Sequence, residues 1–324
     1  MTQLIEKLKG YLENREINNV LIFPHNLPDG DTLGSAIGIQ NLIKSYNKNG
    51  YIVINDDIPS NLLFLFEGEY ETISSHEAAS LDYQLIIAVD TGELKLIEDR
   101  TFLMTEAVPV INIDHHITNQ NYGDLNIVEA EASSTGELVF KISKMLEVQI
   151  GAACAQGLYA AIVTDTGNFR YSNTREYTFK VCGELMGKGF DFNRLNVEIF
   201  QNKSFEKLLL LNKIFDTLAL HYDGKCAVVK LERTLKETLR LEEYDTDGVV
   251  EYVRDIKGVE VVVFIKHMES DNYKVSMRSK NEFDVSQVAL AFEGGGHKKA
   301  AGFRIDQEIN MLEKAILKKI GETI

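Results

Sequence analysis

Cysteine is scarce in this sequence, and long hydrophobic runs are missing. The three cysteines, Cys154, Cys182 and Cys226, are widely separated in a chain of 324 residues. Such an odd, dispersed set predicts reduced thiols in a cytoplasmic protein and argues against a disulfide framework or a zinc site. No apolar stretch is long enough to cross a bilayer, and residues 1–13 mix charged and apolar side chains like a surface helix rather than a signal peptide. We therefore expect no membrane partner.

Basic residues are also under-represented. Lysine and arginine number 34 against 49 aspartates and glutamates, so the formal net charge is −15. Affinity for extended nucleic acid depends on many lysine and arginine contacts to phosphates, so this composition opposes binding of a long duplex. A short anionic ligand held by a local cationic pocket remains compatible with it. The chain length favours two domains over one.

Four hydrophobic segments, interpreted as strands that deliver ligands, end in acidic or imidazole side chains. These are His25, Asp29 and Asp31 after the first segment, Asp90 after the second, Asp114, His115 and His116 after the third, and Asp165 after the fourth. A lone aspartate in such a place is usually a turn or helix-capping residue, which suits Asp90 or Asp165 taken singly. Buried charges are costly unless they are paired or metal-bound, so one common site explains the whole set better.

The ligand types indicate which metal such a site would hold. Carboxylate oxygens with a minority of imidazole nitrogens, and no thiolate near the motifs, suit manganese or magnesium better than structural zinc. Six candidate ligands exceed the usual coordination of one ion, so we expect two ions that share a carboxylate. Such a pair can activate water for hydrolysis of a phosphate ester.

The motifs resemble those of the DHH phosphoesterases, which are named for an Asp-His-His triplet like residues 114–116. Residues 294–302, GGGHKKAAG, are similar to the signature of the DHHA1 domain that accompanies them. Together the resemblance covers nearly the whole chain. Within the family, this two-domain form is most similar to the bacterial nanoRNases, which are bifunctional oligoribonucleases and pAp phosphatases.

The resemblance implies a role for each motif residue. One manganese ion would be held by His25, Asp29 and Asp90, and the other by Asp31, Asp90, His115 and Asp165. Asp90 would bridge the two ions. His116 would face the scissile phosphate, and Asp114 would orient a neighbouring histidine. The catalytic candidates are therefore His116, Asp90 and Asp114.

Short apolar runs that alternate with amphipathic stretches predict an α/β fold with a parallel sheet flanked by helices. Strands are expected at 20–24, 51–55, 85–90, 108–114, 227–231, 259–266 and 273–278, and helices at 32–48, 176–188, 205–221 and 285–292. With the family resemblance, this pattern gives an N-terminal DHH catalytic domain at 1–190, a helical linker at 191–221 and a smaller α/β DHHA1 substrate-binding domain at 222–324.

Two polar segments have local interpretations. Residues 133–137 fit a helix N-terminus in which Ser134 and Glu137 form a capping box, although a helix N-terminus can also receive a phosphate. Residues 166–174 could offer Arg170 to a phosphate and Phe169 or Tyr171 to a base, but aromatic side chains in such a place are more often packed.

The three glycines at 294–296 predict a backbone that can approach a phosphate closely. The segment is not a P-loop, because the Gly-Lys-Ser/Thr ending is absent. Arg278, Lys280, His297 and Lys298 would form a cationic cluster for one end of a short nucleotide. The candidate substrate-binding residues are Arg170, Arg278, Gly294, Gly295, Gly296, His297 and Lys298.

The expected protein is a manganese-dependent phosphoesterase, with magnesium as the alternative ion, that degrades very short RNA to mononucleotides and also dephosphorylates adenosine 3′,5′-bisphosphate. If two domains hold opposite ends of one substrate, the cleft between them favours a few nucleotides over long RNA. Three alternatives stay open. The protein could hydrolyse linear di-adenylate from cyclic di-AMP, or it could be a nucleotide-binding regulator without activity. It could also be a pyrophosphatase, although the glycine-rich segment counts against that activity. The resemblance also implies a homodimer.

Overall fold

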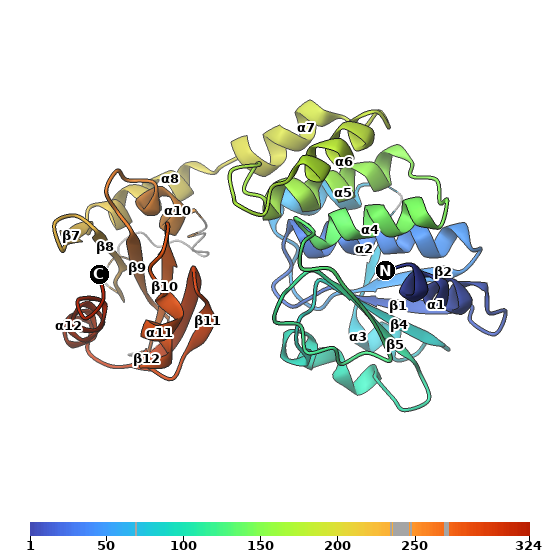
Figure 1. Cartoon of the computed structure of the whole chain (residues 1–324), viewed down its shortest axis with the longest axis horizontal. Coiled ribbons are helices and arrows are strands. Elements are labelled where there is room, and N and C mark those ends of the chain that lie inside the picture. The colour runs from blue at the N-terminus through green and yellow to red at the C-terminus, as the bar shows by residue number, and fades with distance from the viewer. Residues whose placement is uncertain (69, 234, 236–245, 247, 269–271) are drawn as a thin grey trace. The chain divides into compact units, whose positions relative to one another are not determined.

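The computed structural model of the protein describes every residue apart from 69, 234, 236–245, 247 and 269–271. The chain forms two compact units, Met1–Asn202 and Lys203–Ile324, and each has its own sheet (Figure 1). Both units combine strands with helices, so the predicted α/β fold class is confirmed. None of the described helices is long and apolar enough to cross a membrane.

A six-stranded parallel sheet forms the centre of the first unit. Its strands, in spatial order, are β3 (Thr72–Ile73), β2 (Asn49–Val53), β1 (Asn19–Phe23), β4 (Leu85–Val89), β5 (Val110–Asp114) and β6 (Leu125–Val128). The four strands predicted from this part of the sequence correspond to β1, β2, β4 and β5. Because β1 and β4 are neighbours from which the chain continues toward opposite edges, their carboxyl ends mark the switch point where open α/β sheets bind ligands.

Helical segments cover both faces of this sheet. One face carries α1 (Thr2–Glu13), α2 (Gly30–Ser45), α4 (Thr135–Met145) and α5 (Ala152–Asp165), and the other carries α3 (Ser75–Ala78) and the 3₁₀ segment η2 (Leu94–Leu103). The remaining elements of the unit are η1 (Ser60–Phe66), α6 (Glu176–Met186), α7 (Phe192–Asn196) and η3 (Val197–Gln201). Side chains of β1 alternate between the two cores, with Ile22 in one and Leu21 in the other.

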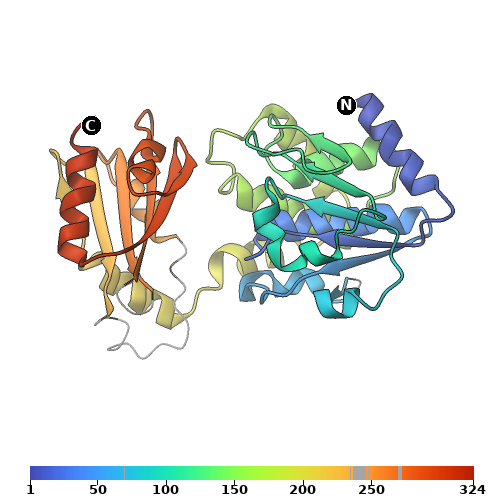
Figure 2. The ribbon, with the colours of Figure 1, turned by 90° about the horizontal axis from the view of Figure 1, so that it is seen from below.

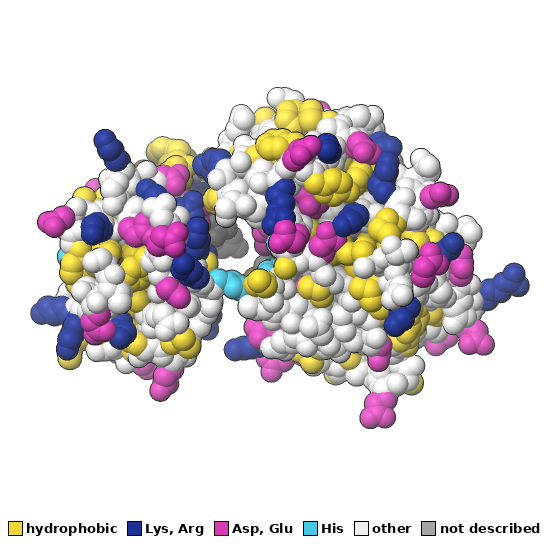
Figure 3. All heavy atoms as spheres, viewed as in Figure 1, with side chains coloured by type: hydrophobic (Ala, Val, Ile, Leu, Met, Phe, Trp, Pro, Cys, Tyr) yellow, Lys and Arg dark blue, Asp and Glu magenta, His cyan; other side chains and the backbone are white. Residues whose placement is uncertain are grey.

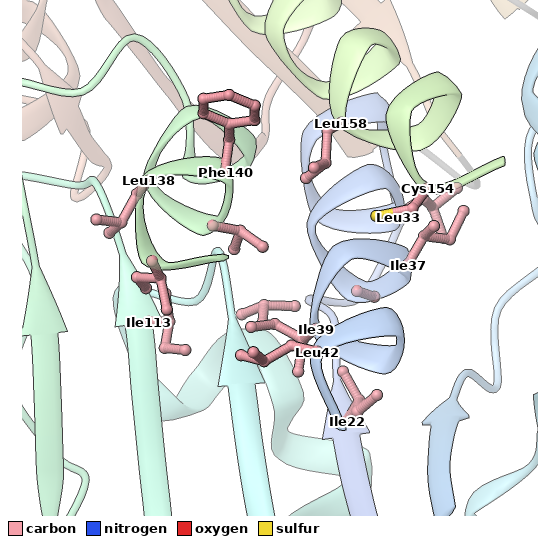
Figure 4. Packing of buried hydrophobic residues seen from close by; sticks show 14 of the residues in the cluster. Ile22, Leu33, Ile37, Ile39, Leu42, Ile113, Leu138, Phe140, Cys154 and Leu158 are labelled. Carbon is pink, nitrogen blue, oxygen red and sulfur yellow. The ribbon is translucent and has the colours of Figure 1, made fainter. Parts of the chain in front are cut away.

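Close packing joins α2 to α5. A Cβ atom on Gly34 of α2 would lie 2.1 Å from the carbonyl oxygen of Gly157 in α5, so only glycine fits there. Figure 4 shows Leu33 of α2 and Leu158 of α5 in the same apolar cluster. A Cβ on Gly30, the first residue of α2, would likewise meet Thr164 near the end of α5. The contact therefore brings the beginning of α2 beside the end of α5.

The sequence of the fourth hydrophobic segment predicts a strand, but the structure shows a helix there. Asp165 is the last residue of the fourteen-residue helix α5. The apolar run before it is buried almost completely, from Leu158 to Val163. Periodicity cannot distinguish a helix that is buried all round from a buried strand, which is why the segment was misassigned.

The second unit has a mixed six-stranded sheet. Its strands, in spatial order, are β11 (Gly295–His297), β12 (Ala300–Asp306), β10 (Asn272–Ser279), β9 (Val261–His267), β8 (Cys226–Leu231) and β7 (Ala219–His221). Only β8 and β9 are parallel; the other neighbouring pairs are antiparallel. α8 (Phe205–Phe215) and α10 (Val249–Arg254) pack on one face, and α11 (Val285–Leu290) and α12 (Ile309–Ile320) on the other, where α12 is plain in Figure 2.

Two predicted features of this unit need correction. The helix expected at 205–221 ends at Phe215, because residues 219–221 instead pair with β8 as strand β7. The glycine-rich segment, for which no strand was expected, is partly the edge strand β11, hydrogen-bonded to β12. Gly296 has φ +136, and a Cβ there would lie 2.5 Å from the Ala300 carbonyl oxygen, so the position requires glycine.

Candidate metal centre

The motif residues of the first unit converge at the carboxyl end of its sheet. His25 follows β1, Asp29 caps α2 and Asp31 lies in its first turn. Asp90 directly follows β4, and Asp114 ends β5 just before His115 and His116. Asp165 arrives from α5 rather than from a strand. The structure thus brings all eight motif side chains to the switch point between β1 and β4.

One group of potential ligands comprises His25, Asp29 and Asp90. Nε2 of His25 lies 3.5 Å from Oδ2 of Asp90 and 3.7 Å from Oδ1 of Asp29. One ligand atom from each residue lies within 4.8 Å of the others, a spacing at which a single ion could contact all three.

A second group comprises Asp31, His115 and Asp165, and it meets the same spacing. Nε2 of His115 lies 3.7 Å from Oδ2 of Asp31 and 3.8 Å from Oδ2 of Asp165. It also lies 3.8 Å from Oδ1 of Asp90. The two oxygens of the Asp90 carboxylate therefore face different histidines, one in each group.

Hydrogen bonds to the backbone orient both of these histidines. Nδ1 of His25 lies 2.8 Å from the carbonyl oxygen of Asn26, and Nδ1 of His115 lies 3.3 Å from that of Ala132. A carbonyl can only accept, so in each ring Nδ1 is the donor to the backbone, and Nε2, in its deprotonated form, is the atom left to coordinate a metal.

His116 has a different partner and more solvent contact. Its Nδ1 donates to Oδ1 of Asp114 at 2.7 Å, and its side chain is 36% exposed, against 13% for His115. Burial alone would lower the pKa of His116, but the bond to Asp114 and the nearby carboxylates outweigh it and raise the pKa to about 9. Asp114 is fully buried, and although burial works in the opposite direction, the bonds from His116 and Asn119 lower its pKa. In the ion-free site, the His116 imidazole is thus protonated at neutral pH. Its bond to Asp114 uses Nδ1 and leaves Nε2 available.

The N-terminus of α4 binds the carboxylate of Asp31. The amide of Thr135 donates to Oδ2 at 2.8 Å, and the amide of Gly136 donates to Oδ1 at 2.9 Å. Helix N-termini favour anions, so this contact stabilises a charge that would otherwise be buried without compensation. These two amides serve a side chain of the protein, which counts against the phosphate-binding alternative.

The capping box predicted for this helix is half present. Ser134 accepts a hydrogen bond from the amide of Glu137 at 3.0 Å, as expected. The Glu137 carboxylate does not return to Ser134, because it accepts hydroxyl bonds from Ser133 and Thr178, each at 2.6 Å. The other carboxylate oxygen, Oε1, accepts the backbone amide of Ser133 at 3.3 Å, so both oxygens of Glu137 have partners other than Ser134.

Several residues that support the site were not predicted. Thr135 donates its hydroxyl to Oδ1 of Asp90 at 2.9 Å, and Asn173 donates to Oδ2 of Asp165 at 3.1 Å. Asn26 supplies the carbonyl that orients His25, and Asn119 contacts Asp114. Apart from the position of Thr135 in the predicted helix start, nothing in the sequence distinguishes these residues from ordinary loop side chains.

The carboxylates of the centre repel one another. Burial and the charges of Asp90, Asp165 and Asp29 raise the pKa of Asp31 well above its ordinary value. Burial is the main cause that raises the pKa of Asp165 to about 6; attraction from His115 opposes it, and repulsion from Asp90 and Asp29 adds to it. The backbone of Asp90 is also held at φ +55, which is unfavourable for an aspartate. Divalent cations would relieve this repulsion, so the donor set fits metal ions.

The predicted substrate residues are divided between the units. Arg170 follows α5 and is exposed, and its Nε donates to the carbonyl of Gly167 at 2.7 Å. Its neighbour Phe169 stacks on Phe179 with ring centroids 5.0 Å apart, which favours the packed interpretation. The other candidates lie on or beside β10 and β11 of the second unit: Arg278, Gly294, Gly295, Gly296, His297 and Lys298.

Two of these basic residues already have local partners. Arg278 is half-buried and donates to the carbonyl of Met277 at 3.1 Å, and Lys298 pairs with Glu282 at 3.2 Å. Register places His297 and Arg278 on the two sides of Ala300 in β12. The structure therefore places Arg278 and His297 on the two strands that flank β12 in one sheet.

Comparison with known proteins gives a consistent result. Residues 19–162 match the model of the DHH family N-terminal domain, and residues 224–324 match that of the DHHA1 domain. The bifunctional oligoribonuclease and PAP phosphatase NrnA of Thermus thermophilus is 32% identical over 284 residues, which cover 87% of this chain and 83% of that protein. The probable NrnA of Streptococcus mutans is 28% identical, over 92% of this chain and 91% of that protein.

Among solved structures, an exopolyphosphatase-related protein from Bacteroides fragilis superimposes with a TM-score of 0.90. The superposition covers 99% of this chain and 97% of that one, at 24% sequence identity. The likeness shows that the two chains share a fold.

Proposed function

The chain belongs to the DHH family of phosphoesterases and carries a DHHA1 domain, and from this premise we propose that it is a metal-dependent hydrolase of very short RNA and of adenosine 3′,5′-bisphosphate. The observation that carries the proposal is the carboxylate of Asp90, which has one oxygen toward His25 and the other toward His115. A carboxylate in that position can bridge two ions.

The proposed ligands of the first ion are His25, Asp29 and Asp90, and those of the second are Asp31, Asp90, His115 and Asp165. Both sets consist of carboxylate oxygens with one imidazole nitrogen each, which suits manganese, with magnesium as the alternative. When bound, such ions lower the pKa of water and stabilise negative charge on a phosphoryl group.

His116 is the proposed general acid. The bond to Asp114 favours the protonated ring, whose pKa is about 9 in the ion-free site, and it fixes the orientation of the ring through Nδ1. Nε2 can then donate a proton to the leaving oxygen of a phosphate ester. Asp114 is buried and hydrogen-bonded at both oxygens, so it positions His116 rather than touching the substrate.

A small nucleotide substrate fits the composition and the relatives. The net charge of −15 opposes extended nucleic acid, whereas local groups such as the guanidinium of Arg278 and the imidazole of His297 can donate hydrogen bonds to single phosphates. The Thermus thermophilus relative is named for oligoribonuclease and PAP phosphatase activities. We assign Arg170, Arg278, Lys298 and the segment from Gly294 to His297 to substrate binding.

The test is product analysis over time with purified protein. Substrates are a 5′-labelled RNA trinucleotide, a 24-residue RNA, adenosine 3′,5′-bisphosphate, linear di-adenylate and pyrophosphate, each with manganese, magnesium or chelator. Rapid manganese-dependent loss of the trinucleotide and the bisphosphate, with slow loss of the long RNA, supports the proposal.

The other outcomes separate the alternatives. Turnover confined to linear di-adenylate would assign the protein to cyclic di-AMP breakdown. Release of phosphate from pyrophosphate alone would indicate a pyrophosphatase. Tight nucleotide binding without turnover of any substrate would indicate a regulator.

A further inference from the structure

The sheet of the second unit has one face that is only partly covered. Val275 and Met277 of β10 point into the core beneath α11 and α12. On the opposite face, α8 and α10 cover apolar side chains of β8 and β9, such as Val229 and Phe264. Side chains of β10 and β12 on that face do not belong to either apolar core.

This partly covered face carries a row of three cations. Lys274 of β10 pairs in register with Lys266 of β9 on one side and with Arg304 of β12 on the other. Directly opposed residues of antiparallel strands have Cβ atoms about 4.5–5.5 Å apart, so the three side chains emerge next to one another. We call these three residues the outer cationic row.

Like charges opposed in this way destabilise a sheet unless something else compensates. Lys274 and Arg304 are exposed, and neither forms an ion pair with a described residue. Lys266 is half-buried and donates to the hydroxyl of Thr246 at 3.1 Å. On the face of the molecule drawn in Figure 3, basic and acidic side chains are interspersed, so a row of one sign differs from the general pattern.

Four residues along β10, the same face carries Arg278, which is one of the proposed phosphate-binding residues. Side chains of one face recur every second residue, so Lys274, Ser276 and Arg278 project in the same direction. Four residues of strand span about 13 Å, which is longer than the distance between successive phosphates of one nucleic acid strand. Register places Arg278 beside Ala300, and Ala300 beside His297.

Between the two cationic positions the surface has almost no side chains. Ser276 pairs with Gly302 of β12, and Gly302 pairs with Gly295 of β11. Gly295 is exposed, and a Cβ there would meet no atom within 4 Å. A sugar or base can therefore approach the sheet between one phosphate at Arg278 and another at the outer cationic row.

We propose that the outer cationic row of Lys266, Lys274 and Arg304 is a second phosphate subsite, which binds the backbone of an RNA oligonucleotide beyond the residues held at Arg278 and His297. This proposal rests on the proposed function. The sheet of the second unit would then determine which lengths of short RNA the protein prefers. Adenosine 3′,5′-bisphosphate is too short to bind at both positions, whereas a tetranucleotide is long enough.

The test compares the KM of an RNA tetranucleotide with that of adenosine 3′,5′-bisphosphate for the K274Q/R304Q double variant. Both side chains are exposed at the sheet surface, so the variant is expected to fold, which circular dichroism checks. We expect the KM ratio of tetranucleotide to bisphosphate to rise about tenfold at low salt, because two charge contacts are lost. The slope of log KM of the tetranucleotide against log salt should fall by about 1.4, which is about 0.7 for each lost contact to a single strand.

A charge-matched control is K314Q/K318Q. Both lysines are exposed on α12, which packs on the other face of the same sheet. The control removes two positive charges from the same unit, so it should leave the KM ratio and the salt slope as in the wild type.

The outcomes distinguish this inference from the proposed function. If wild-type protein hydrolyses both substrates but K274Q/R304Q has the same KM ratio as the wild type, the second subsite is refuted and the function stands. An equal effect of K314Q/K318Q would show general charge attraction and would also overturn the subsite. If the wild type hydrolyses neither substrate, the proposed function itself fails. In that case direct binding of labelled tetranucleotide to the wild type and K274Q/R304Q decides about the subsite, and equal affinities overturn it.

Discussion

The hydroxyl of Thr135 donates a hydrogen bond to Oδ1 of Asp90 at 2.9 Å, and both side chains are buried. Thr135 is the first residue of α4, whereas Asp90 follows β4, so the bond connects a helix to the carboxyl end of a strand. It fixes the carboxylate whose two oxygens face His25 and His115. Outer hydrogen bonds of this kind set the orientation of metal ligands.

Replacing Thr135 with valine should weaken manganese binding without large changes in shape. The variant removes the hydroxyl bond to Asp90, and loss of such an outer partner typically lowers metal affinity about 10- to 100-fold. Titration calorimetry with manganese measures the effect. Thr135→Ser keeps a hydroxyl and should bind nearly as the wild type does, whereas unchanged affinity of Thr135→Val would show that the bond does not matter.

Replacing Asp90 with asparagine should abolish turnover and reduce bound manganese from two ions to at most one. The amide cannot bridge two cations with two anionic oxygens, and loss of a bridging ligand should lower kcat by about 10³-fold or more. Metal content after gel filtration and the rate of trinucleotide hydrolysis are the two readouts. Asp57→Asn changes the same charge at an exposed position away from the motifs and serves as control. Near-normal turnover of Asp90→Asn would refute the bridging role.

Replacing His116 with glutamine should lower kcat while leaving metal affinity close to that of the wild type. Nδ1 of His116 is engaged by Asp114, so the ring is assigned to proton donation rather than to a metal. Loss of a general acid costs about 10²- to 10⁴-fold. In the ion-free site the pKa of His116 is about 9, and bound cations would offset the part that comes from Asp90 and Asp165. The wild type should therefore lose activity on the alkaline side of its pH profile, at or below about pH 9, and the variant should lack this limb. A loss of bound manganese in His116→Gln would instead make His116 a ligand.

Manganese binding should release protons. Hydrogen bonds and charge from Asp29 and Asp90 overcome the effect of burial and raise the pKa of His25 to about 11 in the ion-free site. His25 must lose its proton to coordinate an ion, so affinity should increase with pH. Calorimetry at pH 7.5 in buffers of different ionisation enthalpy counts the released protons. We expect about one or more for each protein molecule saturated, and a count of zero would exclude His25 as a ligand.

Replacing Asp165 with asparagine should stabilise the ion-free protein at neutral pH. The pKa of Asp165 is raised to about 6, so its ionised form is disfavoured in the folded chain. Ionisation of Asp165 therefore lowers the free energy of unfolding of the wild type. This destabilisation is fully present at pH values above the raised pKa, and it disappears as pH falls toward the ordinary aspartate pKa of the unfolded chain. Because the side chain is 32% exposed, we expect a gain of only about 1 kcal/mol, or about 2–4 °C in Tm.

Thermal unfolding with chelator at pH 7.5 and at pH 4 measures whether the substitution raises or lowers the Tm at each pH. The gain of Asp165→Asn should be present at pH 7.5 and absent at pH 4, where the wild-type carboxyl is protonated. Manganese should raise the Tm of the wild type more than that of the variant, because only the wild type keeps the carboxylate that we propose as a ligand. A lower Tm of the variant at pH 7.5 with chelator would show that the carboxylate is not under repulsion.

The convergence of the motif side chains could be predicted from the sequence because strand ends in parallel sheets share an edge. Asp90 and Asp114 come at the ends of short, near-continuous apolar runs that are typical of buried strands, so their meeting follows from the predicted topology. Asp165 lies at the same edge of the sheet, but no strand carries it there. Its apolar run is a helix, and only the packing of α5 against α2 brings its end to the site.

Contacts that depend on side-chain competition could not be predicted. Glu137 had the right spacing for a capping box, but the hydroxyls of Ser133 and Thr178 bind its carboxylate instead. Thr178 lies 41 residues away along the chain, so no local pattern indicates it. The short strand β7 was hidden for a similar reason, since its three residues become a strand only by pairing with β8.

The tight contact between Gly34 and Gly157 has a consequence for two carboxylates that lie about one turn away along α2 and about two turns away along α5. Asp31 stands on α2 and Asp165 on α5, so the separation of these two carboxylates depends on how closely the two helix backbones approach. That approach is set where Gly34 meets the Gly157 carbonyl, with no room for a methyl group. The glycine pair therefore sets the distance between the two helices, and a single added carbon there would alter the separation of the Asp31 and Asp165 carboxylates without touching either side chain.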